Sequence, residues 1–191
     1  MRGLVTAVGP TTDPYGSVAL WLPPNKSIES LPVILASGLW RLKYKLSPTG
    51  RKRFFRDFLP LLDATKRAVL GPRANASYYL VYIGTKAHCR GMGLAKRLVE
   101  DVSNVADAQG VPMYLESSHE RNLKLYRRLG FEVRKRIFLP SPKEDGARIP
   151  LDVMVREPGG LLSMAAVDSG VGMSPQTTQE RVEEDATTAG K

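Results

Sequence analysis

The sequence has very few of the residues that form disulfides or bind transition metals: one cysteine and two histidines among 191 residues. Cys89 alone cannot form an intramolecular disulfide, which is typical of proteins kept in a reducing compartment. Cys89, His88 and His119 together do not supply the four ligands of a typical structural zinc site. We therefore expect a cytoplasmic protein that holds no metal.

Long apolar runs are missing as well. No run of about 18 apolar residues occurs, so we predict no segment that crosses a membrane. Residues 1–16 lack a sustained apolar core followed by a small-residue cleavage site, so we expect no secretion signal. With 42% hydrophobic residues, the chain is long enough for one sizeable domain and an appendage.

The net charge of +9 is unevenly distributed along the chain. Residues 159–191 carry five acidic and two basic side chains, a net charge of −3, which leaves +12 for residues 1–158. A basic domain suits a polyanionic ligand, and both a phosphorylated coenzyme and nucleic acid meet that description. We predict one domain over residues 1–158 and a largely disordered, acidic tail rich in Ser, Thr and Gly over residues 159–191.

The stretch around which the domain is organised begins with an apolar run, Tyr78–Ile83, that predicts a buried strand. A basic, glycine-containing loop follows over residues 86–93, and from Gly93 the apolar spacing is helical, with a predicted stripe of Leu94, Leu98, Val102 and Val105. A strand, a glycine loop and a helix aim unpaired backbone N–H groups and the positive end of the helix dipole at one point. This arrangement is typical of a phosphate site.

Two common phosphate loops are excluded by residue identity. A dinucleotide-binding GxGxxG loop needs a third glycine, but Lys96 stands three residues after Gly93. A Walker A loop ends in Gly-Lys-Ser/Thr, which this loop does not contain.

The remaining apolar patterns predict a mixed α/β fold. Strands are expected over Leu4–Val8, Ser17–Leu22, Val111–Ser118, Phe131–Leu139 and Ile149–Arg156, and a short helix over His119–Gly130. The strand–helix–strand crossover makes Tyr78–Ile83 and Val111–Ser118 parallel, and the two flanking strand pairs are expected to be antiparallel hairpins.

Residues 28–70 show mostly helical spacing, with an interruption at residues 47–50 and a break expected at Pro60. The stretch from Arg41 to Arg73 holds ten Lys or Arg residues against Asp57 and Asp63. No zinc-finger, RRM or other nucleic-acid signature accompanies these charges, so we favour an exposed helical face or a cap over a substrate pocket above nucleic-acid contact.

Glu116 is an unusual residue for a strand that both faces of a sheet would cover. Alternation places Met113 and Leu115 on one face of the strand and Tyr114 and Glu116 on the other. A carboxylate buried there needs a partner or a purpose. The sequence leaves a structural role and a catalytic role open.

Two motifs together resemble the GNAT acetyltransferase superfamily. Residues 90–95, RGMGLA, have the pattern Arg-x-x-Gly-x-Gly/Ala, and residues 122–131 read N…YxxxGF at the expected spacing. Gly16–Pro24, Leu115–Ser118 and the closing strand are also similar to puromycin N-acetyltransferase and its fungal relatives. The resemblance covers roughly residues 4–158.

The resemblance implies acetyl-CoA as co-substrate and a mostly antiparallel mixed sheet whose two parallel strands splay apart. The pantetheine arm would enter this gap, and Gly84 would form a bulge that exposes backbone to it. The residues implied in coenzyme binding are Ile83, Gly84, Thr85, Arg90, Gly91, Met92, Gly93, Leu94, Ala95 and Asn122.

The resemblance also implies the chemistry. Glu116 would be the general base, its pKa raised by burial, and Tyr126 would hydrogen-bond the leaving sulfur. The expected acceptor is the primary amine of a small molecule, in a monomer or homodimer. A protein-lysine acetyltransferase and an inactive coenzyme-binding remnant are the alternatives, the latter because the strand and two helices that open the family's fold are expected to be absent before the first hairpin.

Overall fold

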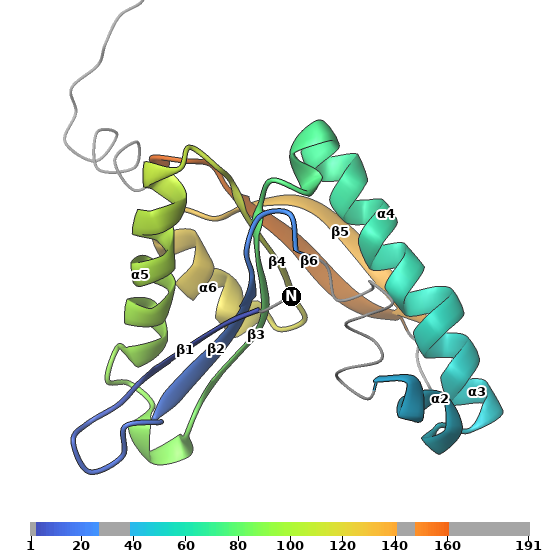
Figure 1. Ribbon diagram of the computed structural model, residues 1–191, viewed down its shortest axis with the longest axis horizontal. Coiled ribbons are helices and arrows are strands. Elements are labelled where there is room, and N and C mark those ends of the chain that lie inside the picture. The colour runs from blue at the N-terminus through green and yellow to red at the C-terminus, as the bar shows by residue number, and fades with distance from the viewer. Residues whose placement is uncertain (1–2, 27–38, 141–147, 161–191) are drawn as a thin grey trace, which may run out of the picture.

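The computed structural model describes residues 3–26, 39–140 and 148–160, and these form one six-stranded mixed sheet in the order β1-β2-β3-β4-β6-β5. Figure 1 shows the sheet with helices on both of its faces. The strands are β1 (Leu4–Val8), β2 (Ser17–Leu22), β3 (Tyr78–Thr85), β4 (Met113–Ser117), β5 (Glu132–Pro140) and β6 (Arg148–Arg156). None of the described helices is both long and apolar enough to cross a membrane.

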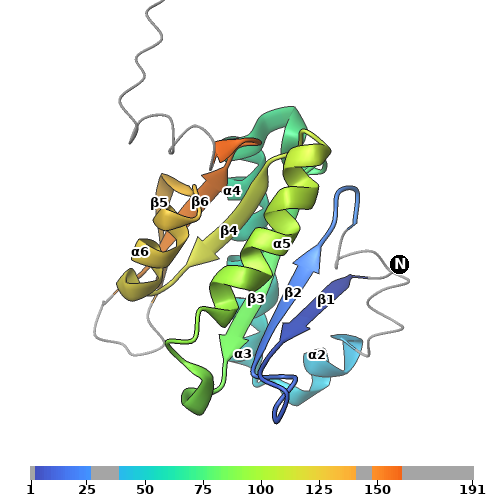
Figure 2. The same ribbon diagram turned by 90° about the vertical axis from the view of Figure 1, so that its left-hand side faces the viewer.

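The strand directions confirm the predicted mixed α/β fold. The pairs β1–β2, β2–β3, β4–β6 and β5–β6 are antiparallel, and only β3–β4 is parallel. Helix α5 (Leu94–Ala108) connects the parallel strands and crosses in front of the sheet in Figure 2.

The parallel strands separate after three paired residues. Their register runs only from Tyr78 opposite Met113 to Leu80 opposite Leu115. Beyond Leu80, β3 continues to Thr85 while its pairing with β4 has ended. This is the splayed pair that the sequence predicted.

The bulge in β3 lies earlier than predicted. Leu20 pairs with Tyr82 and Trp21 with Leu80, so Val81 is the extra residue, whereas Gly84 pairs regularly with Val18. The placement of the bulge at Gly84 was therefore wrong. A bulge bends and twists its strand, and this one lies where β3 leaves β4.

The two faces of the sheet carry different helices. Helices α5 and α6 (Glu120–Arg128) cover one face, and α4 (Leu59–Leu70) covers the other (Figure 1). Met113 and Leu115 belong to the core under α5 and α6, while Tyr114 belongs to the core under α4. The predicted alternation along β4 is thereby confirmed.

The buried faces of α5 and α6 are rotated slightly from those that apolar spacing predicts, which for α6 is a face of Asn122, Leu125, Tyr126 and Leu129. Val105 of α5 is 45% exposed, and Ala106 is buried in its place. In α6, Leu123 is buried and Asn122 is exposed. Apolar spacing sets the period of a stripe but leaves its centre uncertain by a residue.

Helical turns are almost continuous from Leu39 to Ala74. They comprise η1 (Leu39–Arg41), α2 (Leu42–Lys45), α3 (Pro48–Arg51), the π-helix η2 (Lys52–Phe58), α4 and the 3₁₀ turn η3 (Gly71–Ala74). Ser47 caps α3 by accepting a hydrogen bond from Gly50 N at 3.1 Å. The expected break at Pro60 does not occur: the π-helix η2, in which Leu59 N donates to Phe54 O, continues directly into α4, and Pro60 lies in the first turn of α4. The predicted helix start at residues 28–38 and most of the predicted tail lie outside the described residues.

Candidate active site

The gap between β3 and β4 forms a cleft of about 190 Å³. Its walls come from the separated ends of the two parallel strands and from the start of α6. The lining residues are Leu80, Val81, Tyr82, Ile83, Leu115, Glu116, Ser117, Ser118, Asn122 and Tyr126. The cleft thus brings together Ile83, Glu116, Asn122 and Tyr126, four residues that the sequence singled out.

The other predicted coenzyme residues lie in β3 beyond the cleft, in the loop that leads to α5 and in the first turn of α5. Gly91 and Gly93 have φ of 81° and 74°, a backbone region that favours glycine. Gly93 is the N-cap of α5, and no side chain caps the amides of the first turn. A Cβ placed on Gly91 or Gly93 would meet no atom within 4 Å. The helix N-terminus is therefore open, as an anion site requires.

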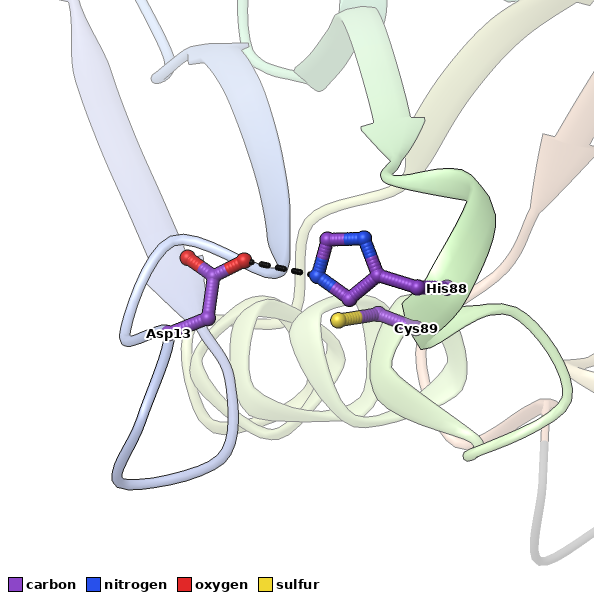
Figure 3. A group of neighbouring side chains, drawn as sticks. All are labelled: Asp13, His88 and Cys89. Atoms are coloured by element: carbon purple, nitrogen blue, oxygen red, sulfur yellow. Dashed lines mark hydrogen bonds and ion pairs between the residues drawn. The ribbon is translucent and has the colours of Figure 1, made fainter.

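The start of this loop is anchored to the β1–β2 hairpin by ionic contacts. Lys86 Nζ donates to Asp13 Oδ1 at 2.7 Å and to Oδ2 at 2.9 Å, and His88 Nε2 lies 3.0 Å from Asp13 Oδ2. Figure 3 shows the His88 ring pointing at the Asp13 carboxylate beside Cys89. The hydrogen bond from Lys86, reinforced by His88, lowers the pKa of Asp13. These contacts fix the chain at Lys86 and His88, four and two residues before Arg90.

Asp13, His88 and Cys89 also bring three potential metal-ligand atoms within 4.8 Å of one another. A metal ion there would have to displace the Lys86 ammonium, which contacts both oxygens of Asp13. We assign these side chains a structural role on that ground. Cys89 itself is buried against Gly16, where an added Cβ would come within 2.9 Å of its sulfur.

Glu116 lies where β4 has lost its parallel neighbour, and it is largely enclosed. Burial raises the pKa of its carboxyl group, while hydrogen bonding from Tyr79 and the positive charge of Lys66 lower it in part. The Tyr114 hydroxyl is close enough to act on Glu116, but among the described residues it has no hydrogen-bond partner of good geometry. We therefore treat its effect on Glu116 as that of a neighbouring dipole. Burial is the largest influence, and the net pKa shift is upward.

Lys66 projects from α4 onto the same face of the sheet. Its ammonium lies 5.1 Å from the centre of the Tyr79 ring and 5.7 Å from that of Tyr114, within range of cation–π attraction. Burial lowers the pKa of Lys66, and the nearby Glu116 and Asp63 charges oppose this shift. A cation, two phenols and a carboxylate thus share one enclosed site.

A second cavity, of about 370 Å³, lies between α4 and the sheet, and we call it the α4 pocket. Its residues are Leu22, Lys26, Phe54, Phe58, Leu59, Leu62, Asp63, Lys66, Arg67, Ala74, Asn75, Tyr79, Val81, Glu116 and Leu151. Glu116 and Val81 line both this pocket and the cleft. The two cavities therefore meet at the only strand carboxylate that the sequence marked as a candidate base.

Tyr126 and His119 occupy defined positions in α6. Tyr126 is buried, packs edge-on against Phe131 at 5.9 Å between ring centres, and lines the cleft; burial raises the pKa of its hydroxyl. His119 caps α6, and its Nδ1 accepts a hydrogen bond from Arg121 N at 3.1 Å. A capping role explains His119 without a part in catalysis.

Sequence reasoning missed the side chains that surround Glu116. Tyr114 stands two residues before Glu116, so alternation alone put both on one face, and that signal was available. No sequence pattern indicated that Lys66 lies beside Glu116, because nothing in the sequence distinguishes it from the other basic residues among the ten in the helical stretch. Its position beside Glu116 follows only from the packing of α4 on the sheet.

Comparison with known proteins gives consistent results. Residues 65–133 match the Acetyltransferase (GNAT) domain family. A protein of Schizosaccharomyces pombe described as an uncharacterized N-acetyltransferase is 44% identical over 158 residues, which are 83% of this chain and 61% of that protein. The chain therefore spans about three fifths of the length of this relative.

A solved structure shares the fold. A mosquito arylalkylamine N-acetyltransferase-like protein superimposes with a TM-score of 0.51 at 15% identity, over 75% of this chain and 68% of that one. A structure described as a histone acetyltransferase and related acetyltransferase from Corynebacterium glutamicum gives 0.48 at 23% identity, over 82% and 65%. The narrower resemblance to puromycin N-acetyltransferase stays a prediction. The family match, the fungal relative and the splayed sheet agree that this chain belongs to the GNAT superfamily of acetyltransferases.

Proposed function

We propose that this protein transfers the acetyl group of acetyl-CoA to the primary amine of a small molecule, with Glu116 as the general base. The observation that carries the proposal is the position of Glu116, a largely enclosed carboxylate that lines both the cleft between β3 and β4 and the α4 pocket. A base that bridges two cavities can reach a proton on a group that enters from either one.

The residues present fit the coenzyme. The diphosphate would lie on the first-turn amides of α5, at Gly93, Leu94 and Ala95, with Arg90 beside it. The pantetheine arm would follow the edge of β3 from Thr85 toward Ile83, where no strand of the described sheet pairs with it from the β4 side. Asn122, exposed at the rim of the cleft, is placed to hydrogen-bond the same arm.

The proposed reaction joins the amine nitrogen to the acetyl carbon and breaks the bond from that carbon to sulfur. Glu116 accepts the proton that the amine loses, directly or through a water molecule. Backbone N–H groups near Ile83 stabilise the charge that develops on the carbonyl oxygen. Tyr126 donates a hydrogen bond to the departing sulfur. Full proton transfer from Tyr126 would be uphill, since a phenol has a pKa of about 10 and a thiol about 8.5.

Two alternatives differ in the acceptor and in activity. The acceptor could be a lysine of a protein, or the chain could bind the coenzyme without turnover. Lys26 and Arg67 line the α4 pocket, and their charge disfavours a basic peptide. The α4 pocket also supplies an acceptor wall from within this chain, and the helical stretch before β3 is our candidate for the cap over it.

A thiol-release assay tests the proposal. Acetyl-CoA is incubated with the protein and amines of several classes, and calorimetry measures binding of acetyl-CoA and of desulfo-CoA. We expect both coenzymes to bind and a subset of small amines to give thiol release. Binding without release for any amine would favour the inactive remnant, release with lysine peptides alone would favour the protein-lysine acetyltransferase, and the absence of binding would refute the proposal.

A further inference from the structure

We infer that the α4 pocket binds the acceptor and that the acceptor is an amine attached to an apolar, ring-containing body. The inference rests on the proposed function and deepens it. It concerns the side chains that face the pocket from η2, α4 and the sheet.

One part of the wall that η2 and α4 form is apolar, and Asp63, Lys66 and Arg67 form the charged part. Phe54, Phe58, Leu59 and Leu62 line the apolar part from the helical side, and Leu22, Val81 and Leu151 face them from the sheet. Phe54 and Phe58 lie with ring centres 6.0 Å apart and planes inclined by 35°. A cavity of about 370 Å³ with such walls falls in the range that small-molecule ligands occupy.

Both rings belong to the π-helix η2. Leu59 N donates to Phe54 O, an i to i+5 bond that widens the helix at this turn. Segments of this kind are uncommon and frequent at functional sites. Here the widened turn presents Phe54 and Phe58 to the cavity and leaves Phe55 outside its lining.

The charged groups are placed for the amine end of such a molecule. Asp63 and Arg67 pair with each other at 3.0 Å near the solvent, so Glu116 and Lys66 are the charges of the inner end. The Lys66 ammonium repels a protonated amine and favours the neutral form, which is the nucleophile. Glu116 can then accept the proton that the neutral amine loses when it attacks the thioester.

The same lining argues against an extended polypeptide. Peptide N–H and C=O groups laid against Phe54, Phe58 and Leu62 would lose water without gaining hydrogen bonds, which makes their burial unfavourable. An aromatic or aliphatic group has no hydrogen bonds to water to lose, and its burial in the pocket is favourable.

The test compares three acceptors in the thiol-release assay: 4-phenylbutylamine, butylamine and a short lysine peptide. We expect kcat/KM for 4-phenylbutylamine to exceed that for butylamine at least about 10-fold, and the peptide to be poorest. Phe58→Ala should reduce this preference about 10-fold. Phe138→Ala, at a half-exposed phenylalanine of β5 outside the pocket, is the matched control and should leave the preference unchanged.

Calorimetry with 4-phenylbutylamine in the presence of desulfo-CoA separates this inference from the proposed function. If no amine is acetylated but 4-phenylbutylamine binds the wild type and not Phe58→Ala, the pocket inference stands and the catalytic proposal falls. Should Phe58→Ala not fold, Leu62→Asn, which adds a polar group to the same wall, takes its place. Equal use of butylamine and 4-phenylbutylamine, preference for the peptide, or a preference unaffected by Phe58→Ala and Leu62→Asn would overturn the inference.

Discussion

Glu116 shows how one residue can be unfavourable for stability and suited to catalysis. Its enclosure raises the pKa of the carboxyl group, and Tyr79, Tyr114 and Lys66 reverse only part of that shift. A carboxylate with a raised pKa holds a proton more strongly at neutral pH than an exposed one does, which makes it a better general base. The pH dependence of activity should report this residue directly.

Replacement of Glu116 by Gln should lower kcat/KM by about 10²–10⁴, the usual contribution of a positioned base. In the wild type, kcat/KM should fall with decreasing pH through an apparent pKa above the ordinary glutamate value of about 4.3. Glu116→Gln should lack this limb. A variant that keeps both the rate and the limb would exclude Glu116 as the base.

The same substitution should raise the thermal stability at neutral pH. Because the folded-state pKa of Glu116 is raised, its ionisation opposes folding as pH rises through that pKa, and below the unfolded pKa both states are protonated. The Tm of Glu116→Gln should therefore exceed that of the wild type at pH 8, and the difference should shrink near pH 4. Differential scanning fluorimetry across pH measures this; a variant less stable than the wild type at pH 8 would contradict it.

Lys66→Met tests the cation beside Glu116. Among the residues that the structure describes, Lys66 is the one cation that contributes to the pKa of Glu116. Its charge lowers that pKa, so its loss should move the acid limb of kcat/KM to higher pH. The methionine keeps an apolar stem against Tyr79 and Tyr114. Arg67→Met, which removes an exposed cation of the same helix, is the control and should leave the limb in place. An unmoved limb in Lys66→Met would mean that Lys66 serves packing alone.

At the scale of elements, the loop before α5 and the N-terminus of that helix depend on the backbone conformation of Gly93. Gly93 has φ of 74° and is the N-cap of α5, so a side chain there strains the backbone at the proposed anion site. Gly110, at the other end of α5, has φ of 64° and equally open surroundings. The two glycines therefore make a matched pair.

Gly93→Val should weaken acetyl-CoA binding at least about 10-fold, the equivalent of roughly 1.4 kcal/mol, because it obstructs the proposed anion site. Gly110→Val should lose similar stability through the same backbone strain yet bind the coenzyme as the wild type does. Calorimetry and chemical denaturation measure the two effects. Equal loss of affinity in both variants would show that strain, and not the position of the glycine, decides binding.

The elements also show which features could be predicted from sequence. Period-2 alternation placed Glu116 and Tyr114 on one face, and the change to helical spacing at Gly93 placed the loop at the start of α5, since both depend on neighbours along the chain. Other features depend on how α4 and β2 pack on β3. These are the bulge at Val81 in place of Gly84, the π-turn at Phe54–Phe58 and the contact of Lys66 with Tyr79. Features that depend on tertiary packing have no signature in the local sequence pattern.

At the scale of the whole molecule, the far end of the sheet is held by an ion pair that involves α5 and β6. Arg156 is fully buried, donates to both Asp107 oxygens at 2.6 Å, and also donates to Leu129 O at 3.1 Å. Asp107 additionally accepts from Gly159 N at 2.7 Å. These bonds connect α5, the end of α6 and β6 at one point.

Asp107→Asn should lower the free energy of unfolding by about 3–5 kcal/mol, because it leaves the buried Arg156 charge uncompensated. Asp63→Asn breaks a pair with side chains 41% and 73% exposed and should cost less than about 1 kcal/mol. The hydrogen bond from Arg156 lowers the pKa of Asp107, so this stabilisation is present at neutral pH and is lost as pH falls through that lowered pKa, below about 4. Urea denaturation at pH 7 and pH 3 measures both; equal effects of the two substitutions at pH 7 would contradict the account.

The whole molecule thus has the proposed coenzyme loop on one side of the sheet, the α4 pocket on the other, and Glu116 at the opening between β3 and β4. A crystal structure of the protein with desulfo-CoA tests this arrangement most directly. We predict pantetheine density between β3 and β4, with the end of the arm beside Glu116 and the diphosphate on the first turn of α5. Coenzyme bound elsewhere, or β3 and β4 paired along their whole length in the complex, would contradict it.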